Sequence, residues 1–155
     1  MSPRSPTPIL IVDTNIVLGA VFGRSDAFRL SDVAMSRSLI CSRDMVIEAA
    51  AVVDRVLPGE ERAAVRLIRS FQAIEVVERH VYVPKIEAAQ RSLRLAPASR
   101  NGSEKDAHVL ALAWTYDADI WSHDRDFAGT GWPSWSSANL AAALSEEAAA
   151  PAVER

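Results

Sequence analysis

A short apolar run that ends in an acid constrains the fold of this chain more than any other feature. Residues Ile9 to Val12 are all aliphatic, mostly β-branched, and Asp13 follows them directly. A run of this kind without polar alternation predicts a strand that is buried on both faces, as in a parallel sheet covered by helices. Because ligands of open parallel sheets bind beyond the carboxyl ends of the strands, Asp13 marks an edge where a functional site is expected.

The size and composition predict one soluble domain. The chain has 155 residues, of which 49% are hydrophobic and 24% charged, and no apolar run approaches the roughly 18 residues that a membrane span needs. The amino end does not have the pattern of a secretory signal. The one cysteine, Cys41, lies in an apolar segment and is predicted to be a core residue, which fits a cytoplasmic location. A net charge of −3 neither favours nor excludes a nucleic-acid partner, because arginines can surround an acidic pocket.

Strands and helices are predicted to alternate along the chain. We expect strands at residues 9–13, 39–42, 73–77, 119–122 and 134–136, and helices from residue 14 and at 25–36, 43–57, 60–71, 86–95, 103–116 and 137–144. This alternation implies right-handed crossovers, and therefore a three-layer α/β/α fold with a mainly parallel sheet of four to five strands. Residues 1–8 are expected to be a disordered leader, 9–144 a single domain and 145–155 a fraying tail.

Four acidic residues together predict a metal site. They are Asp13, Glu48, Asp106 and Asp124. Two follow strands, one begins a helix in register with its apolar stripe, and one faces inward from another helix. Strand carboxyl ends and the amino ends of the following helices share one edge of a parallel sheet. Like charges about 4 Å apart repel by roughly 4 kcal/mol at an effective dielectric near 20, so this cluster would need cations or protons. Ligation by oxygen alone favours Mg²⁺ or Mn²⁺ over zinc.

Each acid also has an ordinary structural interpretation. Asp13 could cap a helix, and Asp106 could complete a capping box that Ser103 opens. Glu48 could lie at the edge of a buried face and reach water, whereas Asp124 could cap a turn. These alternatives stay open for each residue alone, and the metal site depends on the convergence of all four.

Histidines are not predicted to bind the metal. His108 comes two residues after Asp106, on nearly the opposite side of the helix. His123 would point away from Asp124 in an extended chain, and His80 precedes a predicted loop. No Ser–His–Asp pattern is recognisable either.

Five basic residues fall in or near loops at the acidic edge. There they could hold a phosphodiester backbone, or be ordinary solvated surface charge. They are Arg24, Arg43, Arg100, Lys105 and Arg125.

Four motifs in order resemble those of a known family. They are Val12-Asp13-Thr14-Asn15, Glu48 on a helix, Asp106-Ala107-x-x-Leu110-Ala111-x-Ala113, and Ser122-x-Asp124-x-Asp126-Phe127. The arrangement, which covers nearly everything from Ile9 to Leu144, resembles the PIN-domain nucleases. In length and single-domain layout it looks most like the VapC-type toxins of bacterial toxin–antitoxin pairs.

The resemblance implies Mg²⁺- or Mn²⁺-dependent cleavage of RNA, a homodimer, and inhibition by a small antitoxin. It makes the same four acids catalytic metal ligands, and adds Asp126 as a fifth ligand. It also implies that three polar residues orient the acids or a metal-bound water: Thr14, Asn15 and Ser122. Ser122 stands where many relatives have threonine, and it keeps the hydroxyl.

Other functions stay open on the residues alone. One is a non-catalytic RNA-binding module of the same fold. Another is a phosphatase with an aspartyl nucleophile, although such enzymes typically need a second acid two residues later, where this chain has Asn15. A phospho-receiver domain would need its phosphoacceptor after a central strand and a late lysine, and neither is evident.

Overall fold

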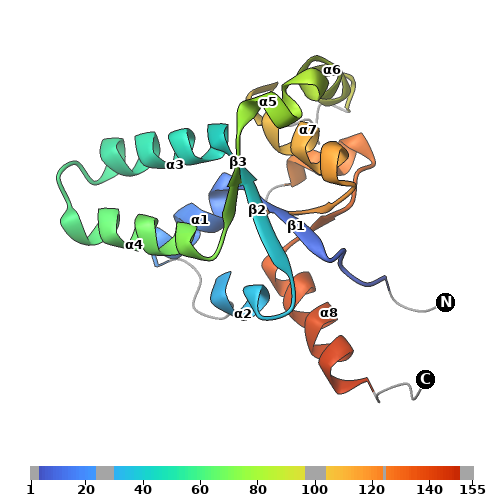
Figure 1. Cartoon of the computed structure of the whole chain (residues 1–155), viewed down its shortest axis with the longest axis horizontal. Coiled ribbons are helices and arrows are strands. Elements are labelled where there is room, and N and C mark those ends of the chain that lie inside the picture. The colour runs from blue at the N-terminus through green and yellow to red at the C-terminus, as the bar shows by residue number, and fades with distance from the viewer. Residues whose placement is uncertain (1–3, 24–29, 97–103, 124, 151–155) are drawn as a thin grey trace.

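The described part of the chain contains a five-stranded sheet in which every strand pair is parallel. A computed structural model describes residues 4–23, 30–96, 104–123 and 125–150. The strands lie in the order β3-β2-β1-β4-β5, which places β1 and its terminal acid at the centre (Figure 1). Their bounds are β1 Ile9–Val12, β2 Ser38–Ser42, β3 Glu75–Val77, β4 Asp119–Trp121 and β5 Ser134–Trp135. The predicted parallel sheet is therefore confirmed.

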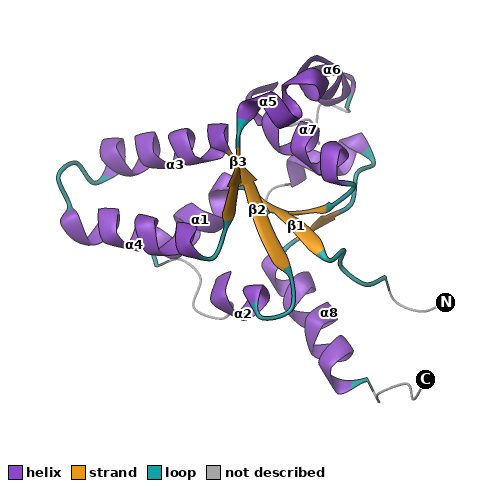
Figure 2. Cartoon of the chain, in the orientation of Figure 1, coloured by secondary structure: helices purple, strands orange, loops and turns teal. Residues whose placement is uncertain are grey.

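Helices cover both faces of the sheet and complete the predicted three-layer fold (Figure 2). Successive strand residues point to opposite faces, so Leu10 and Val12 enter one core whereas Ile11 enters the other. The first core is closed by α1 Thr14–Val21, α2 Leu30–Ala34, α3 Arg43–Val56, α4 Glu61–Gln72 and α8 Ser137–Ala149. The second is closed by α5 Arg79–Tyr82, α6 Ile86–Leu95, α7 Ala107–Tyr116 and the 3₁₀ turn η3 Arg125–Thr130.

The structure confirms that Cys41 is a core residue, and it buries more of α7 than the single apolar stripe that was predicted. Cys41 is fully buried on β2, and its burial raises the pKa of the thiol to about 12. The run of α7 from Ala107 to Ala113 is buried at every position, since this helix packs between the sheet and α6. Of the helices in the described ranges, none is both long and apolar enough to cross a membrane.

Several boundaries differ from the prediction. Residues 79–85 form α5 and the 3₁₀ turn η1 Val83–Lys85, where no helix was predicted. The reason is tertiary: the Tyr82 side chain is fully buried and its hydroxyl donates to Asp44 Oδ2 at 2.6 Å. Helix α7 begins at Ala107 after a 3₁₀ turn, η2 Glu104–Asp106, and α8 continues to Ala149, beyond the predicted end at Leu144.

The chain before β1 is attached to the sheet, although residues 1–8 were predicted to be disordered. Within the described part of this segment, Arg4 forms an ion pair with the buried Asp119 and lies over the ring of Trp135, 5.6 Å from its centroid. The Thr7 hydroxyl accepts from the backbone N–H of Asp119 at 2.8 Å. Composition could not predict this attachment, because it depends on a buried acid at the start of β4.

Candidate active site

Asp13 lies buried at the carboxyl end of β1, where it is also the N-cap of α1. Only 5% of the surface of this residue is exposed to solvent. Oδ1 accepts from the backbone N–H of Thr14 at 2.7 Å, and Oδ2 accepts from the hydroxyl of Ser122 at 2.7 Å. A buried carboxylate is unfavourable unless hydrogen bonds or a cation compensate it, so these donors hold Asp13 in one orientation.

Asn15 and Ser122 connect the ends of β1 and β4. The Ser122 hydroxyl that donates to Asp13 accepts in turn from Asn15 Nδ2 at 3.2 Å. The Asn15 carbonyl oxygen accepts from the backbone N–H of His123 at 3.2 Å. The amide of Asn15 therefore ties the chain after β4 to the start of α1, next to the acid.

Glu48 of α3 lies beside Asp13 because it is hydrogen-bonded to Thr14, the next residue in the chain after Asp13. The Thr14 hydroxyl donates to Glu48 Oε2 at 3.1 Å. His108 Nε2 lies 3.6 Å from the same oxygen, which is an ion-pair distance and longer than a normal hydrogen bond. The pKa of the Glu48 carboxyl is lowered, first by His108 and then by Thr14, with a further effect of the Lys105 charge. Glu48 is therefore ionised at neutral pH.

His108 has contacts that the sequence reasoning did not predict. This residue is indeed on another side of α7 from Asp106, but that side faces α3 and is buried, with only 6% of the residue exposed. Nδ1 of the ring lies 2.7 Å from the hydroxyl of Ser42. A signal was present in the sequence: α7 has no polar face, and a histidine among buried apolar residues needs polar partners.

Asp106 occupies the N-cap position of α7 and is half-buried. Its side chain makes no capping hydrogen bond to α7. The predicted capping box with Ser103 lies outside the described residues. Among the predicted basic residues, Arg43 pairs with Glu78, whereas Lys105 is exposed beside the site.

Several predicted site residues lie outside the described part of the chain. They are Arg24, Arg100, Asp124 and the side chains of Arg125 and Asp126. Within the described residues, no three His, Cys, Asp or Glu side chains are grouped closely enough to hold a metal ion. The described residues still suit a hard cation, because Asp13 and Glu48 both offer carboxylate oxygens. Thr14 donates a hydrogen bond to each of these two carboxylates. No hydrogen bond from the described residues reaches Oε1 of Glu48.

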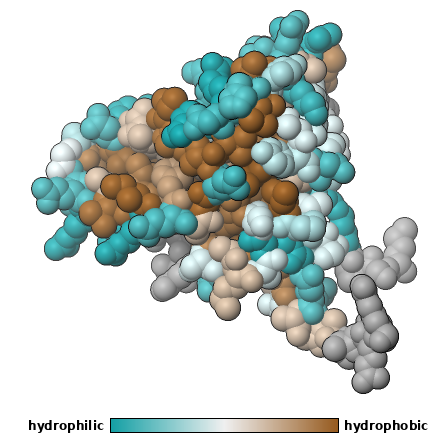
Figure 3. All heavy atoms as spheres, in the orientation of Figure 1, coloured by the Kyte–Doolittle hydropathy of each residue, from teal (hydrophilic) through white to brown (hydrophobic). Residues whose placement is uncertain are grey.

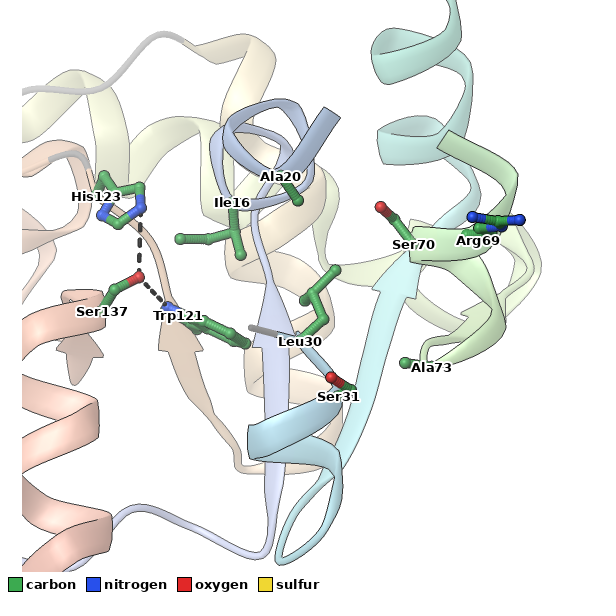
Figure 4. Close-up of a pocket in the computed structure, with 10 residues that line it drawn as sticks. All are labelled: Ile16, Ala20, Leu30, Ser31, Arg69, Ser70, Ala73, Trp121, His123 and Ser137. Atoms are coloured by element: carbon green, nitrogen blue, oxygen red, sulfur yellow. Dashed lines mark hydrogen bonds between the residues drawn. The ribbon is translucent and has the colours of Figure 1, made fainter. Parts of the chain in front are cut away.

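Two cavities adjoin this edge, one lined by α3, α6 and the start of α7 and the other by α1, α2, α4 and α8. A groove of about 700 Å³ runs from Glu48 and His108 along α3 and α6, and Arg55, Arg79 and Lys105 are among its lining residues. The second cavity, of about 440 Å³, lies among α1, α2, α4 and α8 (Figure 4). There the Ser137 hydroxyl accepts from Trp121 Nε1 at 3.0 Å and lies 3.3 Å from His123 Nε2. The ring of His123 thus faces Ser137.

Comparisons with known proteins identify the fold. A family model described as "PIN domain" matches residues 11–145. Among solved structures, VapBC2 from Rickettsia felis, determined with a DNA fragment from their promoter, has a TM-score of 0.64 at 16% identity and covers 83% of this chain and 98% of that one. VapC20 from Mycobacterium tuberculosis, a sarcin-ricin-loop-cleaving toxin, has a TM-score of 0.57 at 22% identity, with 79% and 95% covered.

FitAcB from Neisseria gonorrhoeae is similar to the same extent, with a TM-score of 0.60 at 16% identity and 81% and 96% covered. At these identities the likeness concerns the fold. No curated protein sequence matches this chain.

Proposed function

Since this chain belongs to the PIN domain family, we propose that it is a metal-dependent endoribonuclease that hydrolyses RNA phosphodiester bonds. One observation carries the proposal: the buried carboxylate of Asp13 and the ionised carboxylate of Glu48 are joined through Thr14 at the carboxyl edge of a parallel sheet. This is the edge where open parallel sheets bind their ligands.

The metal ligands that we propose are the four acids Asp13, Glu48, Asp106 and Asp124, with Asp126 as a fifth. Bound Mg²⁺ or Mn²⁺ would supply activation of a water and stabilisation of negative charge on the phosphate and the leaving oxygen. The chain's own residues keep the acids oriented: Thr14 and Ser122 donate to Asp13, and Thr14 donates to Glu48. Asn15 holds Ser122 in place.

The substrate strand is proposed to approach along the groove beside Glu48. Lys105 is exposed there, and Arg55 lies along the same groove, where cations can contact phosphates. Arg79 also lines the groove but is paired with Asp44. Arg43 is a weaker candidate than predicted because Glu78 neutralises its charge. Arg24, Arg100 and Arg125 stay proposals for the same role.

The proposed partners are a second copy of the chain and a small antitoxin, in the cytoplasm. Figure 3 shows apolar side chains gathered between the α3–α4 pair and α5. Such exposed apolar surface commonly marks protein interfaces. The large apolar side chains that are exposed in this half of the molecule include Ile47, Val56, Val65, Ile68 and Val83. The similarity to VapBC2, whose structure was solved with promoter DNA, supports a toxin–antitoxin role.

Two alternatives differ in what the acids do. A non-catalytic RNA-binding module is the second candidate, because the described acids alone do not assemble a metal cluster. A phosphatase with Asp13 as nucleophile is disfavoured, since both oxygens of this buried carboxylate accept hydrogen bonds and the next acid position is Asn15, bonded to Ser122.

Cleavage of a mixed pool of structured RNA tests the proposal. Purified protein with Mn²⁺ or Mg²⁺ is expected to cut RNA, and EDTA or the substitution Asp13→Asn is expected to abolish cutting. Asp54→Asn, which changes an exposed acid of α3 away from the site, is the matched control and should cut normally. Cutting by a folded Asp13→Asn protein at the wild-type rate would overturn the proposal, whereas RNA binding without any cutting would favour the second candidate.

A further inference from the structure

His108 bridges two side chains on different elements from a buried position in α7. The residue is 6% exposed in a helix segment that is otherwise apolar. Nδ1 lies 2.7 Å from the hydroxyl of Ser42, and Nε2 lies 3.6 Å from Glu48 Oε2. Because a buried imidazole is costly without partners, these two contacts define how the ring is oriented.

Glu48 determines which ring nitrogen must carry hydrogen. An ionised carboxylate only accepts, so its contact with Nε2 requires hydrogen on that nitrogen. Nδ1 lies 2.7 Å from the hydroxyl of Ser42, which also accepts from the backbone N–H of Met45 at 3.0 Å as the N-cap of α3. Hydrogen on Nε2 allows Nδ1 to accept from that hydroxyl, and a negative charge beside Nε2 favours this arrangement.

Glu48 needs such support because its side chain is 46% exposed. An exposed glutamate otherwise samples many rotamers. The contacts from Thr14 and His108 both reach Oε2, and they come from opposite cores of the sheet. No described residue donates a hydrogen bond to Oε1, the other carboxylate oxygen of Glu48.

We propose that His108 is a positioning residue of the nuclease, and that Ser42 and His108 together fix the Glu48 carboxylate so that Oε1 is presented to the metal. The inference rests on the proposed function and deepens it, since it adds two residues to the predicted site. Comparable supporting hydrogen bonds around metal ligands affect metal affinity or activity by about 10- to 100-fold.

Two conservative substitutions test the two contacts of the His108 ring one at a time. The amide of His108→Gln can occupy the place of Nε2 and keep a donor toward Glu48, whereas that of His108→Asn can occupy only the place of Nδ1 near Ser42. We expect His108→Gln to keep Mn²⁺ affinity, measured by calorimetry, close to wild type. His108→Asn should lose about 10-fold in Mn²⁺ affinity and in kcat with little change in the KM for RNA. Thermal unfolding shows whether both variants are folded.

A measurement without metal keeps the inference testable if a variant is unstable. The ¹⁵N NMR shifts of the His108 ring should show hydrogen on Nε2 in wild-type protein, and Glu48→Gln should shift Nε2 more than Nδ1. A ring with hydrogen on Nδ1 and none on Nε2, or equal Mn²⁺ affinity in folded His108→Asn and wild type, would overturn the role of His108. Failure of the proposed function has another signature, in which wild-type protein neither binds Mn²⁺ nor cuts RNA, and it would overturn both.

Discussion

The hydroxyl of Thr14 donates to the carboxylate of Glu48 at 3.1 Å, although 34 residues separate them in the chain. The backbone N–H of the same threonine donates to Asp13. One residue at the start of α1 therefore orients two acids, one from the central strand and one from α3. This explains how an acid in the middle of a helix is brought to the edge of the sheet.

Removal of the Thr14 hydroxyl should weaken the site without disturbing the fold. Thr14→Val keeps the β-branched shape and the backbone N–H that binds Asp13, but it loses the bond to Glu48. We expect about a 10-fold loss of Mn²⁺ affinity and of RNA cleavage. Thr14→Ser, which keeps the hydroxyl, is the control and should remain near wild type. Equal metal affinity in the valine variant would show that Glu48 does not depend on this bond.

Tyr82 should make the stability of the protein sensitive to alkaline pH. Burial, and next its hydrogen bond to Asp44, raise the pKa of the Tyr82 phenol from 10.0 to about 12. Because the folded pKa exceeds the unfolded one, this contribution to stability is fully present below pH 10 and is lost as pH rises toward 12.

The Tyr116→Phe variant isolates this titration, since Tyr82 is then the only tyrosine in the chain. Tyrosinate absorbance is expected to rise well above pH 10 in the folded protein. The difference in unfolding free energy between this variant and the double variant that also carries Tyr82→Phe should shrink over the same range. A midpoint near 10 in folded protein would contradict the buried hydrogen bond.

The attachment of the amino-terminal segment should contribute to stability. Asp119 is buried, and it accepts from Arg4 at Oδ1 and from Trp135 Nε1 at Oδ2, at 2.8 Å. Arg4→Ala leaves this acid with one charged partner fewer, so we expect the free energy of unfolding to fall by about 1–3 kcal/mol in urea titrations. Arg4→Lys should recover part of the loss. Unchanged urea midpoints in the alanine variant would indicate that the ion pair is not stabilising.

Sequence patterns predicted more of the fold than of the candidate site. The central strand and the helix at residues 86–95 were predicted within one residue of their observed ends, because apolar runs, helical periodicity and chain breakers are local signals. Thr14 and Ser122 donate to Asp13, and Asn15 donates to Ser122, whereas their orienting role at a metal site remains a prediction. The roles of Asp124 and Asp126 remain predictions.

The alternation of strands and helices, the parallel sheet and the edge at which Asp13 lies could all be predicted from the sequence, because they follow from local apolar patterns and their order along the chain. The partners of His108, Tyr82 and Asp119 could be found only in the folded molecule. Spacing along a helix shows which residues share a face, but not what packs against that face. That choice is made by the packing of elements that are distant in the sequence, such as α3 against α7, and by the burial of polar groups that must find partners.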